Sequence, residues 1–269
     1  MNRFSFQNMM LLKLIAISSF ILLFSGCSKQ TENFETLSVS ELYPQMVGKY
    51  FIYRLDSTVF ENGKNEVIKS YQVKHVVEEK TKDNLNRDAW RINTYINDVN
   101  GSGPWISNGN YIVVPMDKRV EVIENNLRVI KIQLPVVQGF TWKGNSFLPD
   151  RPYSDLYATS VDDNMNQWDF TYETVDGSET IEGTSYPNVT TVLQADESVN
   201  VPMLTNTVYA AREYSIEKYA KNLGLVYREH VLWENQPRQK TTGTPPNEVI
   251  TYDPVRLGFG VKMWLIDHN

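Results

Sequence analysis

Hydrophobic and polar residues alternate along most of the chain after residue 40, in runs of the length typical of β-strands. Phe51, Tyr53 and Leu55 share one face of a run over 50–60, and a second run covers 67–78. Asn62-Gly63 lies between these two runs, and Asn-Gly is typical of a tight hairpin turn. The pattern therefore predicts an antiparallel hairpin near the start of the folded domain.

The same alternation predicts further strands along the rest of the chain. We expect them at 90–96, 111–114, 119–124, 127–134, 168–173, 188–194, 225–234, 249–252 and 258–266. Asn125-Asn126 separates two of them, and asparagine tolerates the positive φ of a hairpin turn. Gly, Ser, Asn and Pro predict loops at 100–110, 135–152 and 240–248.

The segment 208–222 fits both helix and strand, because its apolar residues are compatible with either spacing. We predict a strand, since 225–234 has a clear strand pattern and Asn222-Leu223-Gly224 forms a turn before it. The predicted strands do not alternate with helices, so the sequence gives no indication of a parallel sheet. The predicted fold class is all-β and mostly antiparallel, with few or no helices: a curved meander, a sandwich or a partly open barrel.

The residues before this β-rich region have the pattern of an export signal. Arg3 and Lys13 precede an apolar run from Leu14 to Phe24, which is too short to cross a bilayer comfortably. Ser25-Gly26-Cys27 follows and resembles the lipobox of bacterial lipoproteins, with Phe24 where Leu is usual. The resemblance implies a signal peptide over 1–26 and an acylated Cys27. The polar residues up to 40 have no periodicity and predict a flexible tether over 27–40, and the strand pattern predicts a single β-rich domain over 41–269. An ordinary cleaved signal or a short membrane anchor is the alternative.

Composition narrows the range of partners. The formal net charge is −6, and removal of the two basic residues before Cys27 makes it −8. An acidic chain argues against nucleic acid and anionic lipid headgroups as partners. Cys27 is the only cysteine, so the domain after it has no disulfide. The expected membrane contact is through the lipid on Cys27, and Ser28-Lys29-Gln30 lacks the aspartate that often retains lipoproteins in the inner membrane, which favours the outer membrane.

Two further segments resemble a family of Gram-negative lipoproteins of unknown function. The first is Tyr43-Pro44-x-x-x-Gly48-Lys49-Tyr50, followed by Asp56-Ser57-Thr58-Val59. The second runs from Tyr214 to Glu229 and includes Tyr219-Ala220 and Gly224-Leu225-Val226-Tyr227. The resemblance implies an envelope location and a β-rich fold, and it implies no catalytic residue and no cofactor.

Candidate site residues are few. Asp162, Asn164, Asn166 and Glu173 have the spacing of a calcium-binding loop, although Gln167 replaces the usual glycine. An Asx-rich turn held by local hydrogen bonds is the alternative. Trp105 lies in a Gly/Ser/Asn loop and is the candidate for an exposed, ligand-stacking aromatic residue, whereas the other aromatic residues are expected to pack in the core or to line an apolar ligand.

No catalytic motif occurs, and the three histidines are isolated in the sequence. We expect a non-enzymatic envelope protein that binds an envelope protein or glycan, or has a structural role. The alternatives are a carrier or chaperone of an apolar ligand in a β cavity and, in third place, a hydrolase of glycans or peptides. A large pocket would favour the carrier, and paired carboxylates in a cleft would favour the hydrolase. A filled core would favour the structural role.

Overall fold

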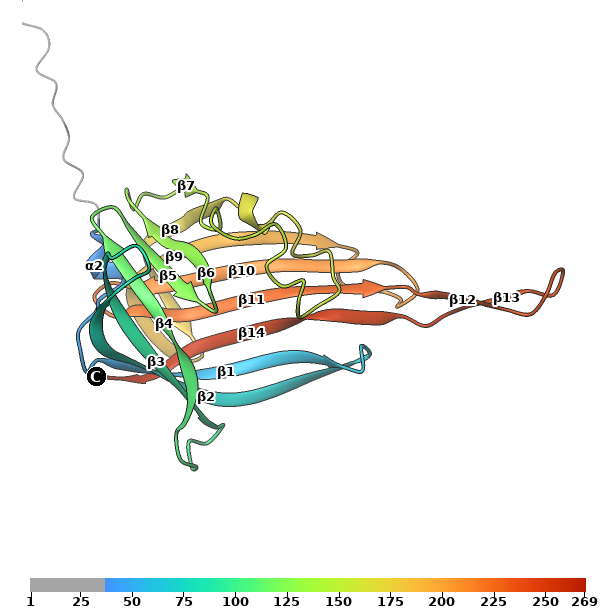
Figure 1. Cartoon of the computed structure of the whole chain (residues 1–269), viewed down its shortest axis with the longest axis horizontal. Coiled ribbons are helices and arrows are strands. Elements are labelled where there is room, and N and C mark those ends of the chain that lie inside the picture. Colours follow the sequence, from blue (N-terminus) through green and yellow to red (C-terminus); the bar gives the residue numbers. More distant parts are fainter. Residues whose placement is uncertain (1–36) are drawn as a thin grey trace, which may run out of the picture. The chain divides into compact units, whose positions relative to one another are not determined.

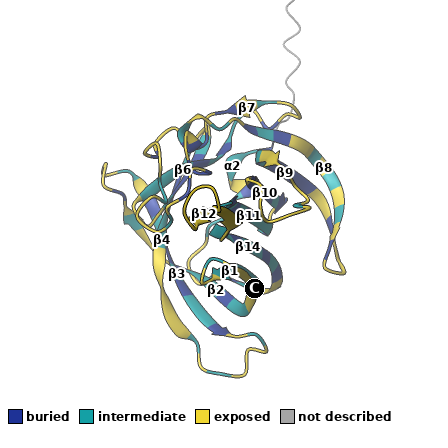
Figure 2. Cartoon of the chain, turned by 90° about the vertical axis from the view of Figure 1, so that its right-hand side faces the viewer, coloured by how far each residue is buried: buried dark blue, intermediate teal, exposed yellow. Residues whose placement is uncertain are grey.

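The computed structural model describes residues 37–269. Within them a twelve-stranded antiparallel sheet curls into a nearly closed barrel (Figures 1 and 2). The predicted all-β fold class is confirmed, and the partly open barrel is the architecture observed. Its strands are β1 (Tyr50–Glu61), β2 (Asn65–Lys82), β3 (Asp88–Asp98), β4 (Ile106–Met116), β5 (Arg119–Glu124), β6 (Leu127–Gln133), β7 (Thr141–Trp142), β8 (Phe170–Ile181), β9 (Thr184–Val199), β10 (Ala210–Ala220), β11 (Gly224–Gln236) and β14 (Val255–His268).

Most strands pair with their neighbours in sequence. β1 to β6 form one meander and β7 to β11 form another. β14 lies between β11 and β1, so it joins the two meanders into one sheet. The predicted strand at 258–266 therefore lies in β14 and connects the two meanders. One of its partners, β11, is near it in the sequence, and the other, β1, is at the opposite end of the domain.

The barrel has a seam between β6 and β7, which are the edge strands of the sheet. A backbone hydrogen bond crosses the seam from Ile130 N to Gly144 O (2.8 Å), and the Trp142 indole N–H donates to Ile130 O (2.9 Å). The Tyr172 hydroxyl donates to Gln133 O (2.9 Å) and accepts from Gln133 N (3.1 Å). Side chains therefore supply hydrogen bonds at the seam that a backbone ladder supplies elsewhere in the barrel.

Local sequence explains the hairpin turns. Asn62, Asn125 and Asn126 all have positive φ, as the turn residues of the predicted hairpins require. The ambiguous segment 208–222 contains strand β10, so the strand prediction was correct. β10 is paired on both sides, with β9 and β11, and this tertiary pairing selects the strand over the helix.

Three predicted loops and one strand boundary were wrong in part, and in the loop predicted at 135–152 residues 141–142 form β7. Ile106–Asn110 belong to β4, because they pair with β3 despite their polar composition. Residues 240–242 belong to β12 (Gln239–Thr242), which pairs with β13 (Val249–Tyr252) in a hairpin that projects beyond β11 and β14 (Figure 1). Trp168 precedes β8 and follows the short 3-10 helix η1 (Met165–Gln167), so the strand starts later than predicted.

A short helix, α2 (Val39–Leu42), packs against β4, β6 and β11 at one end of the barrel. Leu42 is fully buried in the main hydrophobic core, and Leu37 is buried in the same core. Ordered contacts therefore begin before residue 41, where the sequence pattern placed the start of the domain. The Tyr43-Pro44-Gln45 segment that follows α2 turns toward the barrel interior and contributes to its lining.

Candidate functional site

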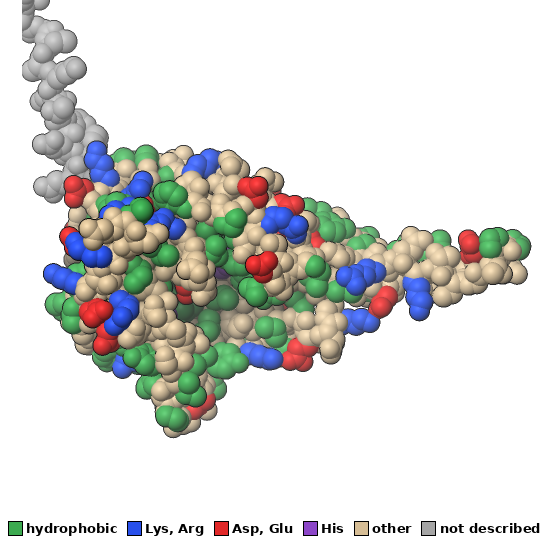
Figure 3. Space-filling view, viewed as in Figure 1, with side chains coloured by type: hydrophobic (Ala, Val, Ile, Leu, Met, Phe, Trp, Pro, Cys, Tyr) green, Lys and Arg blue, Asp and Glu red, His purple; other side chains and the backbone are tan. Residues whose placement is uncertain are grey.

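The barrel encloses a cavity of about 550 Å³. Side chains from β1 to β6, β10, β11 and β14 line it, together with Tyr153 from the loop between β7 and β8. Figure 3 shows the surface hollowed near the middle of one face. Protein sites for small molecules have volumes of about 300–1,000 Å³, so the cavity has a suitable size for one.

One wall of the cavity is apolar and aromatic. Phe51, Tyr53 and Leu55 of β1 face it, as the alternation in the sequence predicts for one face of that strand. Val261 and Met263 of the neighbouring β14 continue the wall. The Tyr53 hydroxyl donates a hydrogen bond to Leu225 O (3.1 Å), so its ring presents an apolar surface while its polar group is satisfied.

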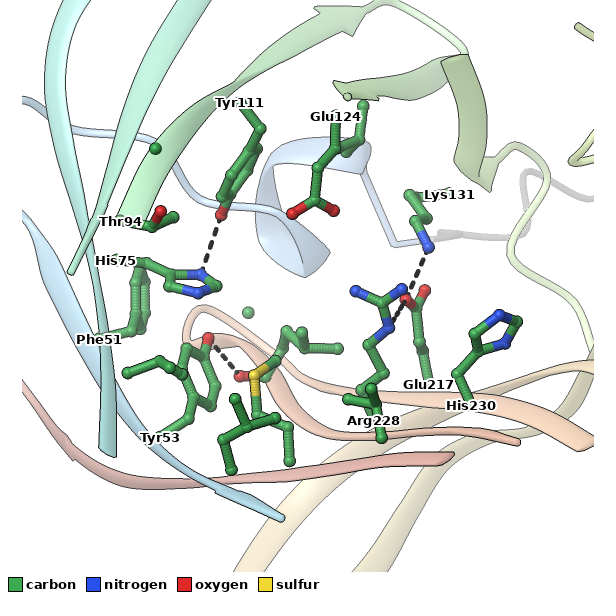
Figure 4. A pocket seen from close by; sticks show the side chains of 18 of the residues that line it. Phe51, Tyr53, His75, Thr94, Tyr111, Glu124, Lys131, Glu217, Arg228 and His230 are labelled. Atoms are coloured by element: carbon green, nitrogen blue, oxygen red, sulfur yellow. Dashed lines mark hydrogen bonds and ion pairs between the residues drawn. The ribbon is translucent and has the colours of Figure 1, made fainter. Parts of the chain in front are cut away.

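His75 and Tyr111 lie beside this wall (Figure 4). The His75 Nδ1 atom and the Tyr111 hydroxyl are 3.2 Å apart and form a hydrogen bond. Burial lowers the pKa of His75 to about 4, and the positive charge of Arg228 acts in the same direction. His75 is therefore uncharged at neutral pH and adds no charge to this side of the cavity.

The opposite wall contains a buried ion pair. The Lys131 ammonium on β6 donates to Glu217 Oε1 on β10 (2.7 Å), while Gln194 and Tyr219 donate to Glu217 Oε2 (2.9 and 2.7 Å). Burial raises the pKa of Glu217, but the nearby charges of Lys131 and Arg228 outweigh burial and bring the pKa to about 2. Glu217 is therefore ionised, with both carboxylate oxygens hydrogen bonded.

Arg228 on β11 is the second cation at this wall. Its Nε atom lies 3.6 Å from Glu217 Oε1, while its side chain is 30% exposed and lines the cavity (Figure 4). Burial lowers the pKa of Arg228, but the charges of Glu217 and Glu124 outweigh burial and raise it, so the guanidinium stays charged. Within residues 37–269, no oxygen atom accepts a hydrogen bond from this guanidinium.

A chain of hydrogen bonds continues from Glu217 to His230. Ser215 Oγ donates to Gln194 Oε1 (2.6 Å), so it accepts from the Nδ1–H of His230 (2.9 Å). This leaves His230 Nε2 as the acceptor that faces the Tyr153 hydroxyl at 3.5 Å. A serine nucleophile needs the reverse polarity, with the hydroxyl donating to the imidazole. In this arrangement the Ser215–His230 pair orients polar groups of the wall.

The candidate sites from the sequence lie elsewhere. Trp105 is half-buried just before β4, with the Lys74 ammonium 5.9 Å from the centre of its ring, and it is not among the residues that line the cavity. Cys27 lies outside the described residues.

The four residues with calcium-loop spacing have other environments. Asp162 is buried and accepts a hydrogen bond from Tyr153 N (2.9 Å), and Asn166 donates to Asp150 (2.8 Å). Asn164 precedes η1, and Glu173 is exposed on β8. In the described part of the chain, no three or more His, Cys, Asp or Glu side chains are grouped so that they could hold a metal ion.

The cavity residues themselves were not identified from the sequence. A signal was nevertheless present on β11, where Arg228 and His230 alternate onto the same face as the buried Val226 and Leu232. A charged residue in register with core residues is unusual unless it has a partner. The partner Glu217 is eleven residues earlier, on the adjacent strand β10, and its own alternation with Ser215 and Tyr219 gives the same signal.

No protein-family model, curated protein sequence or solved structure matches this chain. Among residues 37–269, no helix is both long and apolar enough to span a membrane. The fold and the cavity define an antiparallel β-barrel with a mixed polar and apolar interior, an architecture compatible with ligand binding.

Proposed function

We propose that this protein is a lipid-anchored component of the bacterial outer membrane and that its barrel binds a small amphipathic molecule. Of the three roles considered from the sequence, this is the carrier, with the ligand changed from apolar to amphipathic. The observation that carries the proposal is the cavity of about 550 Å³ with an apolar wall at Phe51 and Leu55 and a charged wall at Glu217 and Arg228.

The composition of the two walls supports an amphipathic ligand over a purely apolar one. An apolar ligand would leave the guanidinium of Arg228 desolvated and without an acceptor, which is costly. A purely polar ligand would gain little from the β1 and β14 wall, where burial of apolar surface contributes about 25 cal/mol per Å². A molecule with one polar end and an apolar body satisfies both walls.

The sequence before the barrel supports the membrane anchor. Acylation of Cys27 would hold the domain at the membrane surface, since stable anchoring needs two lipid signals and a lipoprotein cysteine carries more than one acyl chain. A domain held at the membrane could exchange an amphipathic molecule with the bilayer or with the aqueous space beside it.

A neutral fluorescent probe tests the proposal. N-phenyl-1-naphthylamine fluoresces weakly in water and strongly in an apolar site, so we expect its fluorescence to rise when the full-length chain is added. Leu55→Trp should weaken the rise, because Leu55 lines the cavity and the larger side chain occupies part of it. Ile68→Trp is the matched control, since Ile68 is 61% exposed on the neighbouring strand β2 and does not line the cavity. Equal binding to all three chains, or no binding to any, would refute a ligand site in the barrel.

A further inference from the structure

The charges on the cavity wall specify one end of the ligand. Lys131, Arg228 and Glu217 form a group of two cations and one anion at the cavity wall, so the group has an excess of one positive charge. Glu124 also lines the cavity and its charge acts on Arg228, but Glu124 is exposed and accepts no hydrogen bond from the guanidinium. Among the described residues, Glu217 is therefore the only buried anion in the lining of the cavity, and Arg228 shares it with Lys131.

The hydrogen bonds of the group locate the unused donors. Glu217 Oε1 accepts from Lys131, and Oε2 accepts from Gln194 and Tyr219. Both oxygens are thus already engaged, and Arg228 Nε approaches only to 3.6 Å. The terminal N–H groups of Arg228 face the cavity without an acceptor among residues 37–269 (Figure 4).

We propose that Arg228 is the anion-recognition residue of the cavity and that its ligand carries a carboxylate. This inference rests on the proposed ligand-binding function and names the class of ligand. A planar carboxylate matches the parallel N–H donors of a guanidinium in a bidentate pair. Its single negative charge also balances the excess charge of the group, whereas the dianion of a phosphate monoester would overcompensate it.

The apolar wall then receives the rest of the ligand. Phe51, Leu55, Val261 and Met263 line the same cavity as Arg228, and the neutral His75 lies beside them. An aliphatic or aromatic monocarboxylate would place its charged group at Arg228 and its apolar body at this wall. Lys131 keeps its partner Glu217 throughout, so it acts as a positioning residue that fixes Glu217 and, through it, Arg228.

Two probes of equal chain length separate this inference from the proposed function. We would measure binding of octanoate and of 1-octanol to the full-length chain by isothermal titration calorimetry at pH 7. Octanoate should bind at least about tenfold more tightly than 1-octanol, as expected for a charge-assisted hydrogen-bonded pair. Arg228→Gln should remove this preference while 1-octanol still binds, which also shows that the variant is folded. Arg228→Lys should retain part of the preference, because it keeps the charge and loses the bidentate geometry.

Arg54→Gln is the matched control, since Arg54 lies on β1 but does not line the cavity, and the preference for octanoate should be unchanged in it. Equal binding of the two probes to the native chain, or a preference that survives in Arg228→Gln, would overturn the inference while leaving the ligand site in place. Failure of both probes to bind would contradict the proposed function itself.

Discussion

The Lys131 ammonium and the Glu217 carboxylate are 2.7 Å apart, although β6 and β10 are not neighbours in the sheet. Their ion pair crosses the barrel interior close to the seam between β6 and β7. The pair therefore does two things at once: it links the two meanders across the cavity, and it fixes the carboxylate beside Arg228. Removal of either partner of this ion pair therefore tests its contribution to the stability of the barrel.

Removal of either partner should destabilise the fold strongly. Glu217→Gln leaves Lys131 as a buried ammonium without its counter-charge, and Lys131→Met removes the closest cation of Glu217. Loss of one partner of a buried ion pair costs about 3–5 kcal/mol, and the double variant Lys131→Met/Glu217→Gln should recover part of this loss. Urea denaturation measures these free energies of unfolding.

The control for the buried pair is Lys218→Met, which breaks a more exposed ion pair with Glu179 (2.8 Å). Exposed pairs contribute about 0–1 kcal/mol, so this change should be small. Single variants of Lys131 and Glu217 that are no less stable than Lys218→Met would show that the cross-barrel pair does not stabilise the fold.

Tyr172→Phe tests the seam. Tyr172 is fully buried, and its hydroxyl is the hydrogen-bond partner of both the N–H and the carbonyl of Gln133. The variant leaves these backbone groups without that partner, which costs about 1–3 kcal/mol for a buried unsatisfied group. We expect a lower free energy of unfolding and faster amide hydrogen exchange in β6. Tyr50→Phe is the control, because the Tyr50 hydroxyl bonds only to an exposed Asp267. Unchanged exchange in β6 would show that water or another group replaces the Tyr172 hydroxyl.

Acid should destabilise the barrel in two stages. The pKa of His75 is lowered to about 4 and that of His230 to about 3, chiefly by burial. Between their ordinary pKa of about 6.5 and these values, the unfolded chain binds more protons than the folded chain, so stability falls as the pH falls. Below pH 4.5 the unfolded form of Glu217 also takes up a proton, while the folded form stays ionised to about pH 2.

The midpoint of urea denaturation, measured from pH 7 to pH 3, checks this behaviour. The fall in stability below pH 6.5 should be smaller in the double variant His75→Gln/His230→Gln, because its unfolded state no longer takes up protons at these two positions. A slope between pH 6.5 and 4.5 that is the same in the native chain and in this variant would assign the effect to other groups.

Cys27 is expected to carry the membrane anchor. Cells that express the full-length chain should incorporate radiolabelled palmitate into it, and Cys27→Ser should abolish the incorporation, because the thiol is the only possible site of thioether formation. Ser25→Ala is the control, since alanine is also small enough for cleavage before Cys27. A native chain that remains unlabelled would end the proposal of a lipid anchor.

The sequence predicts the strands better than their assembly. Alternation at Phe51, Tyr53 and Leu55 and the asparagine turn at 125–126 are local signals, and the structure follows them. The pairing of β14 with both β1 and β11 is non-local, and no local pattern specifies it. The segments 106–110 and 240–242, which are mostly polar or glycine, become strands because neighbouring chain segments satisfy their backbone hydrogen bonds.

The site was harder to predict for a related reason. Alternation shows which side chains point inward, as at Arg228 and Glu217, but a filled core and a cavity have the same alternation. The difference depends on how far apart opposite walls of the barrel lie, and this distance depends on the strand number, the curvature and the placement of α2 at one end. The loop context of Trp105 makes it a candidate in the sequence, whereas the observed lining comes mainly from strands.

The most direct test of the ligand site is a crystal structure of the full-length chain with 8-bromooctanoate. We predict an anomalous bromine peak inside the barrel near Phe51 and Met263, and a carboxylate within hydrogen-bonding distance of Arg228. Bromine found only on the protein surface, with the barrel interior occupied by water alone, would contradict it.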